Sequence, residues 1–287
     1  RCEIMRVSEL VDSEPALAVE SVHTPPAKLA TALAASALLT ACGGGGGGGT
    51  TAAPAPGSAS AAPSTPLGAS FATATTDEDA ARFLLQAQFS ASDADIAAVR
   101  SQSYASWLAA QFDAAPSTSG FDWLNQRGYG TINSSTNFYD NSYPGDYMLW
   151  NQLMTSSDAV RKRLALALSE FFVVSLSGLD FAWRSHAIAS WWDMLNAQAT
   201  GNFRNLLQDV TLHPAMGYYL NTKGNLKENP TTGRAPDENY AREVMQLFTL
   251  GIYQLNIDGT EKRDGNGNKL ESYSQSDITN IARVFTG

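Results

Sequence analysis

A run of seven consecutive glycines at residues 43–49 divides this chain more sharply than any other feature. It begins a stretch, 43–76, that has no charged side chain and consists mostly of Gly, Ala, Pro, Ser and Thr. Such a segment cannot bury enough apolar surface to offset the entropy that it would lose on ordering. We therefore expect a flexible linker over 43–76, with a mean reach of roughly 30 Å, and a folded domain over 77–287.

An apolar run, LATALAASALLTA, precedes the glycines at residues 29–41. It is shorter than the ~20 residues of a membrane-spanning helix, and its length is typical of the hydrophobic part of a signal peptide, with Lys28 as the positive flank. The run ends in Leu-Thr-Ala followed by Cys42, which resembles a bacterial lipobox. Cys42 is therefore the expected lipidation site. An ordinary cleaved signal peptide, or a chance alanine-rich run, is the alternative interpretation.

The surroundings of this signal predict where the protein resides. A lipidated cysteine carries enough acyl chains for stable membrane anchoring, and Gly43 in the next position resembles lipoproteins sorted to an outer membrane. We expect an exported protein that is lipid-anchored at the cell envelope, in the outer membrane. Residues 1–27 contain several acidic side chains, which do not suit a signal peptide. We therefore interpret 1–42 as an upstream segment followed by a lipoprotein signal peptide, with the translation start near Lys28.

Charge and cysteine content narrow the classes of function. The formal net charge of −9 opposes binding to phosphate backbones, so nucleic acid is not an expected partner. Both cysteines, Cys2 and Cys42, precede residue 77. The expected domain therefore has no disulfide framework and no thiolate metal site.

Hydrophobic periodicity predicts a mainly α, multi-helical domain over 77–287. Residues 158–175 have apolar side chains at helical spacing on one face and also on the opposite face. We expect this segment to be a central, buried helix. Ser92 with Asp95 resembles a capping box at the start of a short helix. The other expected helices begin at Asp77 and cover 103–113, 145–156, 180–198, 202–212, 214–221 and 237–250.

The remaining segments read as loops, turns and one further helix. Residues 114–144 are rich in Gly, Ser, Asn and Pro, which predicts a long loop. We expect the aromatic side chains of this loop to pack against the rest of the domain. Two turn signals, Asp258-Gly259 and residues 264–268, predict a small β-hairpin near 252–273. A last helix is expected from Ser276 and is still running at Gly287, which predicts that the C-terminal part of the domain is missing.

Four runs in this order resemble a known bacterial family, the domain of unknown function 1800. They are RLALALSEFFVVS (163–175), NFRNLLQDVTLHPAMGYYLN (202–221), PDENYAREVMQLFTLG (236–251) and ARVFTG (282–287). The resemblance covers 77–287, about the N-terminal half of the family domain. It implies a helical fold and an exported protein, and it supplies no established catalytic residue.

Glu170 is the first candidate for chemistry because it lies within the apolar run LALALSEFFVV. A buried carboxylate must find a partner, protonate or reach a wet cleft. It could therefore act as a general acid or metal ligand. The alternative that we favour is a buried ion pair, for example with Arg242, that locks two helices.

A second group of candidates lies at residues 237–243. Helical spacing aligns Glu238 with Arg242 and places Glu243 on the same side as Asn239. These groups could bind a cation or perform acid–base chemistry. The favoured alternative is structural: Asp237 and Glu238 suit a helix N-terminus, and Glu238 with Arg242 forms a surface ion pair.

Two histidines, His186 and His213, lie in the expected domain. Together with Asp237 they are weak candidates for a metal site, although no HExxH or similar spacing is present. Hydrogen-bonded packing roles are the favoured alternative. The cofactor, if any, is left open.

The sequence therefore predicts a surface lipoprotein that acts as a binding or scaffold protein. Its expected partners are the membrane, through the N-terminal lipid, and a polymer or an envelope protein. The alternative function is a carboxylate-dependent hydrolase that acts on an envelope or extracellular polymer. Its candidate catalytic residues are Glu170, Glu238 and Glu243.

Overall fold

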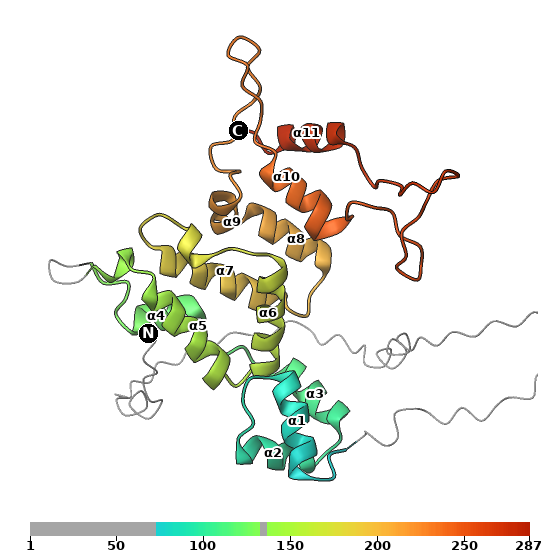
Figure 1. The fold of residues 1–287 in the computed structure, drawn as a ribbon. Helices are drawn as coiled ribbons and strands as arrows, with labels where there is room; N and C mark the ends of the chain where they lie inside the picture. Colours follow the sequence, from blue (N-terminus) through green and yellow to red (C-terminus); the bar gives the residue numbers. More distant parts are fainter. Residues whose placement is uncertain (1–72, 133–136) are drawn as a thin grey trace, which may run out of the picture. The chain divides into compact units, whose positions relative to one another are not determined.

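The computed structural model describes residues 73–132 and 137–287, all of which belong to one compact unit of the chain. The expected lipidation site Cys42, the segment 1–42 and linker residues 43–72 lie outside the described residues. The described part is mainly helical, which confirms the predicted fold class, and Figure 1 shows the helices in chain order.

The bounds of the helices are as follows. The first four are α1 (Asp77–Ala87), α2 (Asp93–Arg100), α3 (Tyr104–Asp113) and α4 (Gly120–Gln126). The next five are α5 (Tyr143–Thr155), α6 (Ala159–Phe171), α7 (Arg184–Gln198), α8 (Phe203–Leu212) and α9 (Pro214–Tyr219). The last are α10 (Asn239–Glu243), the π-helix η5 (Val244–Thr249) and α11 (Gln275–Val284), and short 3₁₀ turns occur at η3 (Phe138–Asp140) and η4 (Leu176–Gly178).

The first two helices begin with the caps that the sequence suggested. The Thr76 hydroxyl accepts a hydrogen bond from the Asp79 amide at the start of α1. Ser92 and Asp95 form the predicted capping box, which satisfies two backbone N–H groups that have no partner within the helix. Trp183 has a left-handed backbone (φ 68°), which is unusual for a bulky residue. Helix α7 therefore begins at Arg184 and not near residue 180 as predicted.

Helix α7 is the central helix of the domain. Its side chains are buried on most of its circumference, including Ile188, Trp191, Trp192 and Leu195. Helices α4, α5, α6, α8 and α9 all pack against it. Burial of this much apolar surface supplies the main stabilisation of the fold.

Helix α6, which we expected to be the central helix, instead connects two hydrophobic clusters. Val160 near its start packs with Leu84, Val99 and Trp107 from α1–α3. Ala165 belongs to the main cluster around α7. The two apolar faces of this helix therefore reflect two different neighbours along its length. At its far end Phe172 is fully buried in the main cluster, whereas Phe171 is exposed.

The helix predicted over 237–250 is interrupted. Only Asn239–Glu243 is α-helical, and Val244–Thr249 continues as a π-helix in which the Thr249 hydroxyl donates to the Val244 carbonyl. Gly251 then adopts a positive φ of 76° and ends the segment as predicted. Helix α11 packs against α10 through Ala241, Ile278 and Ala282.

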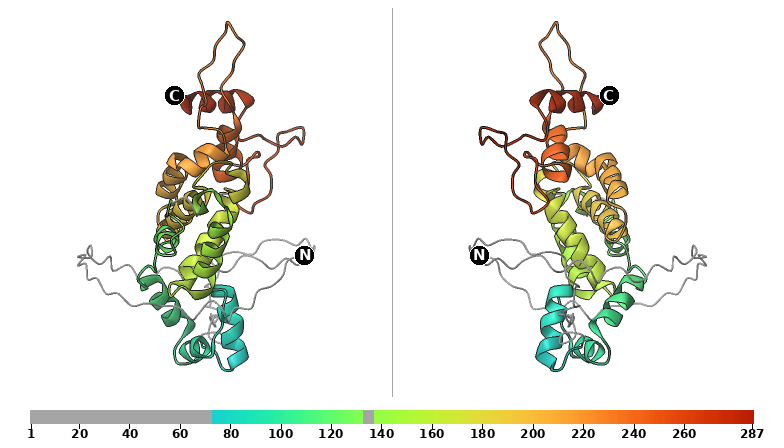
Figure 2. Two further views of the ribbon diagram at one scale, coloured as in Figure 1. Left: turned by 90° about the vertical axis from the view of Figure 1, so that its left-hand side faces the viewer. Right: turned by 90° about the vertical axis from the view of Figure 1, so that its right-hand side faces the viewer.

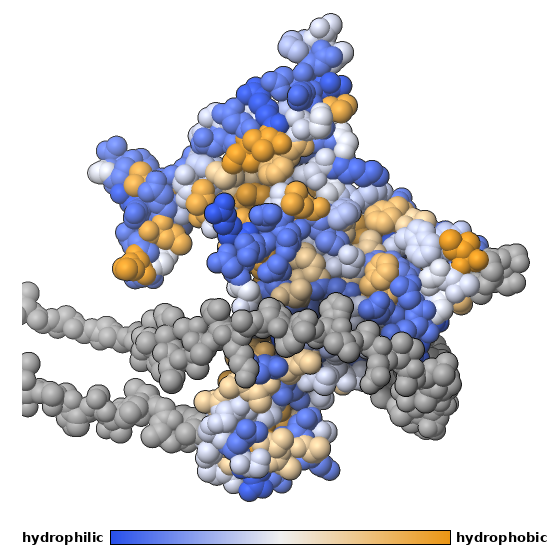
Figure 3. All heavy atoms as spheres, turned by 180° about the vertical axis from the view of Figure 1, so that it is seen from behind, coloured by the Kyte–Doolittle hydropathy of each residue, from blue (hydrophilic) through white to orange (hydrophobic). Residues whose placement is uncertain are grey.

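Residues 252–272 form a projecting arm (Figures 1 and 2) and not the two-stranded hairpin that we predicted. Single antiparallel bridges join three short segments. The backbone N–H of Gln254 donates to Leu270, that of Leu270 to Lys262, and that of Lys262 to Gln254. This closed triangle leaves no continuous ladder. Hydrophobic side chains lie near the far end of the arm in Figure 3, and Leu255 and Ile257 are exposed.

Two further sequence predictions need correction. The expected loop 114–144 contains helix α4, whose N-terminal amides are capped by Asp193 from α7. Helix α11 ends at Val284 and does not run to Gly287.

Within residues 73–132 and 137–287, no helix has the length and apolar character required to span a membrane.

Candidate functional site

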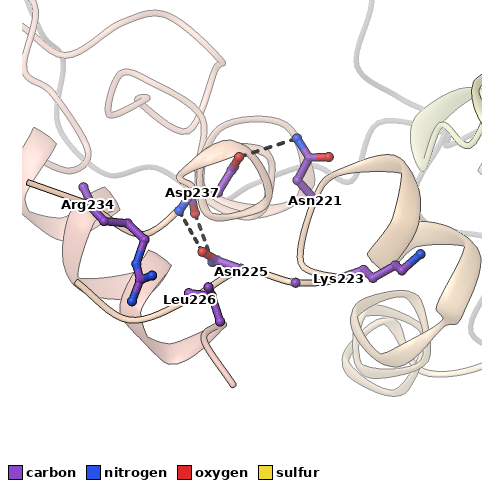
Figure 4. A pocket seen from close by; sticks show the side chains of 8 residues that line it. Asn221, Lys223, Asn225, Leu226, Arg234 and Asp237 are labelled. Carbon is purple, nitrogen blue, oxygen red and sulfur yellow. Dashed lines mark hydrogen bonds between the residues drawn. The ribbon is translucent and has the colours of Figure 1, made fainter. Parts of the chain in front are cut away.

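The predicted candidate Asp237 lies in an open depression of about 280 Å³ between α9 and α10 (Figure 4). The side chain of Asn225 holds the backbone there. Its Oδ1 accepts from the Asp237 amide at 2.8 Å, and its Nδ2 donates to the Asp237 carbonyl at 3.3 Å. The Asp237 carboxylate accepts from the Asn239 amide at 2.8 Å. Asp237 therefore positions the start of α10, as the structural alternative proposed.

The cationic side chains of this depression are also engaged elsewhere. The Lys223 ammonium lies 4.6 Å from the centroid of the Tyr218 ring and points away from Asp237 in Figure 4. The Arg234 Nε donates to the Lys227 carbonyl at 3.0 Å. These contacts stabilise the loop that contains them, and they leave no converging set of charges around Asp237.

Glu238 joins α10 to α11. Its carboxylate accepts from the Thr279 hydroxyl, from Gln275 Nε2 and from Arg242 Nη2, the last at 2.7 Å. The Thr279 hydrogen bond, followed by those from Gln275 and Arg242, holds the pKa of Glu238 below its usual value. The predicted Glu238–Arg242 pair is therefore present. An anionic group that is held in this way is a poor general acid.

The remaining carboxylate candidates lie apart from this network. Glu170 is exposed at the end of α6, so the expectation that it is buried is wrong, and Arg242 pairs with Glu238 instead. Glu243 is half-buried at the end of α10. No contact brings Glu170, Glu238 and Glu243 together among the described residues.

His186 is a packing residue in α7. Its Nε2 lies 3.2 Å from Asn125 Oδ1, an acceptor, so Nε2 carries the proton. The rings of Phe121 and Trp183 pack at its edges. Burial lowers the pKa of His186 and keeps its ring neutral.

His213 contacts Ser190, but in a tautomer that does not activate a serine. Its Nδ1 accepts from the Ala215 amide at 3.2 Å, which places the ring proton on Nε2. Nε2 therefore donates to the Ser190 hydroxyl, 3.2 Å away. A serine nucleophile requires the opposite direction of donation. Burial lowers the pKa of His213 and favours this neutral form.

A metal site is not assembled in the described part of the chain. Within residues 73–132 and 137–287, no three His, Cys, Asp or Glu side chains lie close enough to hold an ion together. The predicted set of His186, His213 and Asp237 is therefore separated into three structural roles.

Three buried or half-buried charged residues were not predicted from the sequence: Asp158, Lys162 and Asp193, which lie on α6 and α7 or directly before them. Asp158 is fully buried, and its carboxylate lies 3.5 Å from the ammonium of Lys162, which is itself 3% exposed. Asp193 accepts from the amides of Gly120 and Phe121 at the start of α4. Burial lowers the pKa of Lys162 and raises that of Asp193. Asp193 therefore joins α7 to α4, whereas Asp158 and Lys162 form a buried pair within the start of α6.

Several large apolar side chains of α5 are exposed to solvent, and three of them are aromatic. One face of this helix packs inward through Met148, Leu149 and Leu153. The opposite face carries side chains at positions i, i+4, i+7 and i+11, the spacing of one helical stripe. These are Tyr143 (36% exposed), Tyr147 (54%), Trp150 (64%) and Met154 (49%).

Two residues that precede α5 extend this stripe. Tyr129 and Phe138 pack edge to face against Tyr143, with ring centroids 6.2 and 6.4 Å away. Burial raises the pKa of Tyr129, and the nearby phenols of Tyr143 and Tyr147 add to the rise. We call this set the aromatic face: Tyr129, Phe138, Tyr143, Tyr147, Trp150 and Met154. The predicted contact of the loop aromatics with the body is confirmed, whereas Tyr147 and Trp150 were missed.

Together, the fold and this surface define a multi-helical protein with an exposed aromatic face. Residues 82–287 match the family described as "Protein of unknown function (DUF1800)", and the chain belongs to this family. The resemblance found in the sequence is thereby confirmed. No curated protein and no solved structure matches the chain.

Proposed function

We propose that this chain is an exported, lipid-anchored protein of the cell envelope, located in the outer membrane, whose helical domain acts as a binding or scaffold protein. The apolar run 29–41 before Cys42 supports export and lipidation. The charge-free segment 43–76 supports a tether between the anchor and the domain. The domain binds a polymer or an envelope protein through the aromatic face.

The single observation that carries the binding function is the exposure of Tyr143, Tyr147, Trp150 and Met154 on one side of α5. Large aromatic side chains gain free energy when they are buried, and they dominate binding interfaces. Three aromatic residues and Met154 together form an apolar stripe on one side of α5, and an exposed apolar patch in soluble proteins marks an interaction site.

The alternative, a carboxylate-dependent hydrolase, has less support. Glu238 is engaged by three donors, and Glu170 lies outside that network. Acid–base catalysis by a pair of carboxylates requires both to face one substrate. The contacts of the described residues do not assemble such a pair.

The binding function is tested by co-sedimentation of the full chain with isolated cell-envelope fragments. We expect the double variant Tyr147→Ala/Trp150→Ala to bind at least tenfold more weakly than the natural chain. Phe112→Ala is the matched control, because Phe112 is an exposed aromatic residue on α3. Equal binding by all three proteins, with unchanged circular dichroism, would contradict the proposal.

The anchoring part is tested separately with Cys42→Ala. We expect this variant to move from the membrane fraction to the soluble fraction, because the acylated thiol is lost. Retention in the membrane with the signal still processed would show that Cys42 is not the anchor.

A further inference from the structure

The aromatic face has the length of an extended ligand. Tyr143 and Met154 are eleven residues apart in one continuous helix, which places them about 16 Å apart along its axis. The rings between them share one side of the helix. A compact ligand would contact only part of this stripe, whereas an extended polymer can lie along all of it.

Polar groups flank the stripe on both sides. At about 3.6 residues per turn, Asp146 and Asn151 fall on opposite edges of the line from Tyr143 to Met154. Asp146 is exposed as a residue, but neighbouring atoms partly desolvate its carboxylate and so raise its pKa. The phenols of Tyr129, Tyr143 and Tyr147 add hydroxyl groups near one end. The surface therefore combines ring faces with hydrogen-bonding edges.

This combination matches the chemistry of a sugar ring. The C–H faces of a pyranose are apolar and stack on aromatic rings, and its hydroxyl groups lie at the perimeter, where they can donate to a carboxylate. The aliphatic Leu, Ile and Val side chains of a helix–helix contact are absent from the stripe over residues 143–154. The surface thus resembles a glycan platform more closely than a seam for a partner helix.

The charge near the aromatic face favours an uncharged glycan over an anionic one. Asp146 is the one charged residue in the sequence of α5, and the chain as a whole has a net charge of −9. The guanidinium of Arg127 lies over the Trp123 ring at 5.0 Å and near Tyr129, so its positive charge is at the Tyr129 end of the face. An anionic polysaccharide would bring its charges close to Asp146 and be repelled.

Resting on the proposed function, we propose that the aromatic face binds an uncharged, extended β-linked glycan. The line of exposed side chains along one side of α5, in which the Tyr143 and Tyr147 rings are tilted by 61° to each other, favours a β-1,4-linked chain, because such a chain is extended and stiff. The rings of Tyr147 and Trp150 stack on successive sugar faces, and Asp146 and Asn151 contact hydroxyl groups at the ribbon edges.

Affinity electrophoresis of the full chain tests this inference with polysaccharides immobilised in the gel. Hydroxyethyl cellulose and glycol chitin are the neutral β-linked probes. Carboxymethyl cellulose has the same backbone with negative charges, and dextran is a flexible, α-linked control. We expect at least one neutral β-linked probe to retard the chain, and carboxymethyl cellulose and dextran to have at least tenfold less effect.

Variants connect the retardation to the aromatic face. Trp150→Ala should reduce the affinity at least tenfold, while Phe112→Ala, with an exposed aromatic residue removed from α3, should leave it unchanged. Asp146→Asn should reduce the difference between the neutral and carboxymethylated cellulose. Thermal melts verify that each variant is folded.

The outcomes separate this inference from the function on which it rests. If neither neutral β-linked probe retards the chain, or if Trp150→Ala and Phe112→Ala behave alike, the glycan assignment is wrong. If envelope fragments still bind through Tyr147 and Trp150 in that case, the proposed binding function stands and its ligand is of another class. If envelope binding is also insensitive to these residues, both proposals fail.

Discussion

Helices α5 and α7 contain similar residues and have opposite surroundings. Both carry tryptophan, methionine and leucine at helical spacing. In α7 the side chain of Trp192 is 2% exposed, whereas Trp150 in α5 is 64% exposed. The difference arises because five helices surround α7, while α5 has neighbours on one side only. The position of a helix in the fold, and not its composition, therefore decides whether its aromatic residues stabilise the core or remain available for a ligand.

The largest expected effect is a difference in the free energy of unfolding between alanine variants of these two tryptophans. Trp192→Ala should lower the free energy of unfolding by about 3–5 kcal/mol, because it removes a fully buried ring and leaves a cavity. Trp150→Ala should change it by less than about 0.5 kcal/mol. Urea denaturation of the two variants measures both values. Similar losses in the two variants would mean that α5 packs on both sides and would remove the contrast.

Buried and exposed lysines should differ in the same way as buried and exposed tryptophans. Lys162→Met should destabilise the protein by about 3 kcal/mol, because it removes the nearer of the two cations beside the buried Asp158 carboxylate and leaves only Arg161, 3.7 Å away. Lys262→Met, at an exposed position on the arm, is the control and should have little effect. Denaturation midpoints compare the two. An equally small change at both lysines would mean that Arg161 alone is sufficient to balance the Asp158 carboxylate.

A smaller effect is expected at the junction of α10 and α11. Glu238→Gln should cost about 1 kcal/mol or less at pH 7, since Glu238 is partly exposed. The folded-state pKa of Glu238 lies below the reference value of 4.5. The stability from its charge is thus present above that reference pH and is lost as the pH falls through the folded-state pKa.

The pH dependence provides the measurement for this junction. The difference in melting temperature between the natural chain and Glu238→Gln should shrink as the pH is lowered from 7 to 3. A difference that grows on acidification would show that the pKa of Glu238 is raised by folding, contrary to its contacts with Thr279, Gln275 and Arg242.

The smallest effect is expected at Glu170. Because this side chain is exposed, Glu170→Gln should change the free energy of unfolding by less than about 0.5 kcal/mol. It should also leave envelope binding unchanged, because Glu170 is not part of the aromatic face. A loss of more than about 2 kcal/mol in the free energy of unfolding would contradict this and would support the buried ion pair with Arg242 that the sequence suggested.

Local features of this fold could be predicted from the sequence, because neighbouring residues determine them. The capping box at Ser92 and Asp95 and the positive φ of Gly251 are examples. The turns at Gly259 and Gly267 also have positive φ values, as the turn signals suggested. The pairing of the arm could not be predicted, because it depends on contacts between Gln254, Lys262 and Leu270 over longer separations.

The candidate site could be predicted only in part, for a physical reason that α5 illustrates. Its inward stripe, which includes Met148 and Leu153, and its outward stripe, which includes Tyr147 and Trp150, are both apolar. Periodicity identifies the helix but cannot decide which stripe meets the body. The prediction for Glu170 was wrong for a related reason: its apolar neighbours suggested burial, but Glu170 lies on the solvent side of α6, while Phe172 at the same end is fully buried against Phe248.

Hydroxyl-radical footprinting of the full chain, read by mass spectrometry, tests the central claim that the aromatic face is a free binding surface. In the isolated protein, Tyr147 and Trp150 should be oxidised readily while Trp192 is protected. Addition of envelope fragments should then protect Tyr147 and Trp150 and leave exposed Phe112 unchanged. If Trp150 were as protected as Trp192 in the isolated protein, or equally reactive with and without envelope fragments, the account would be contradicted.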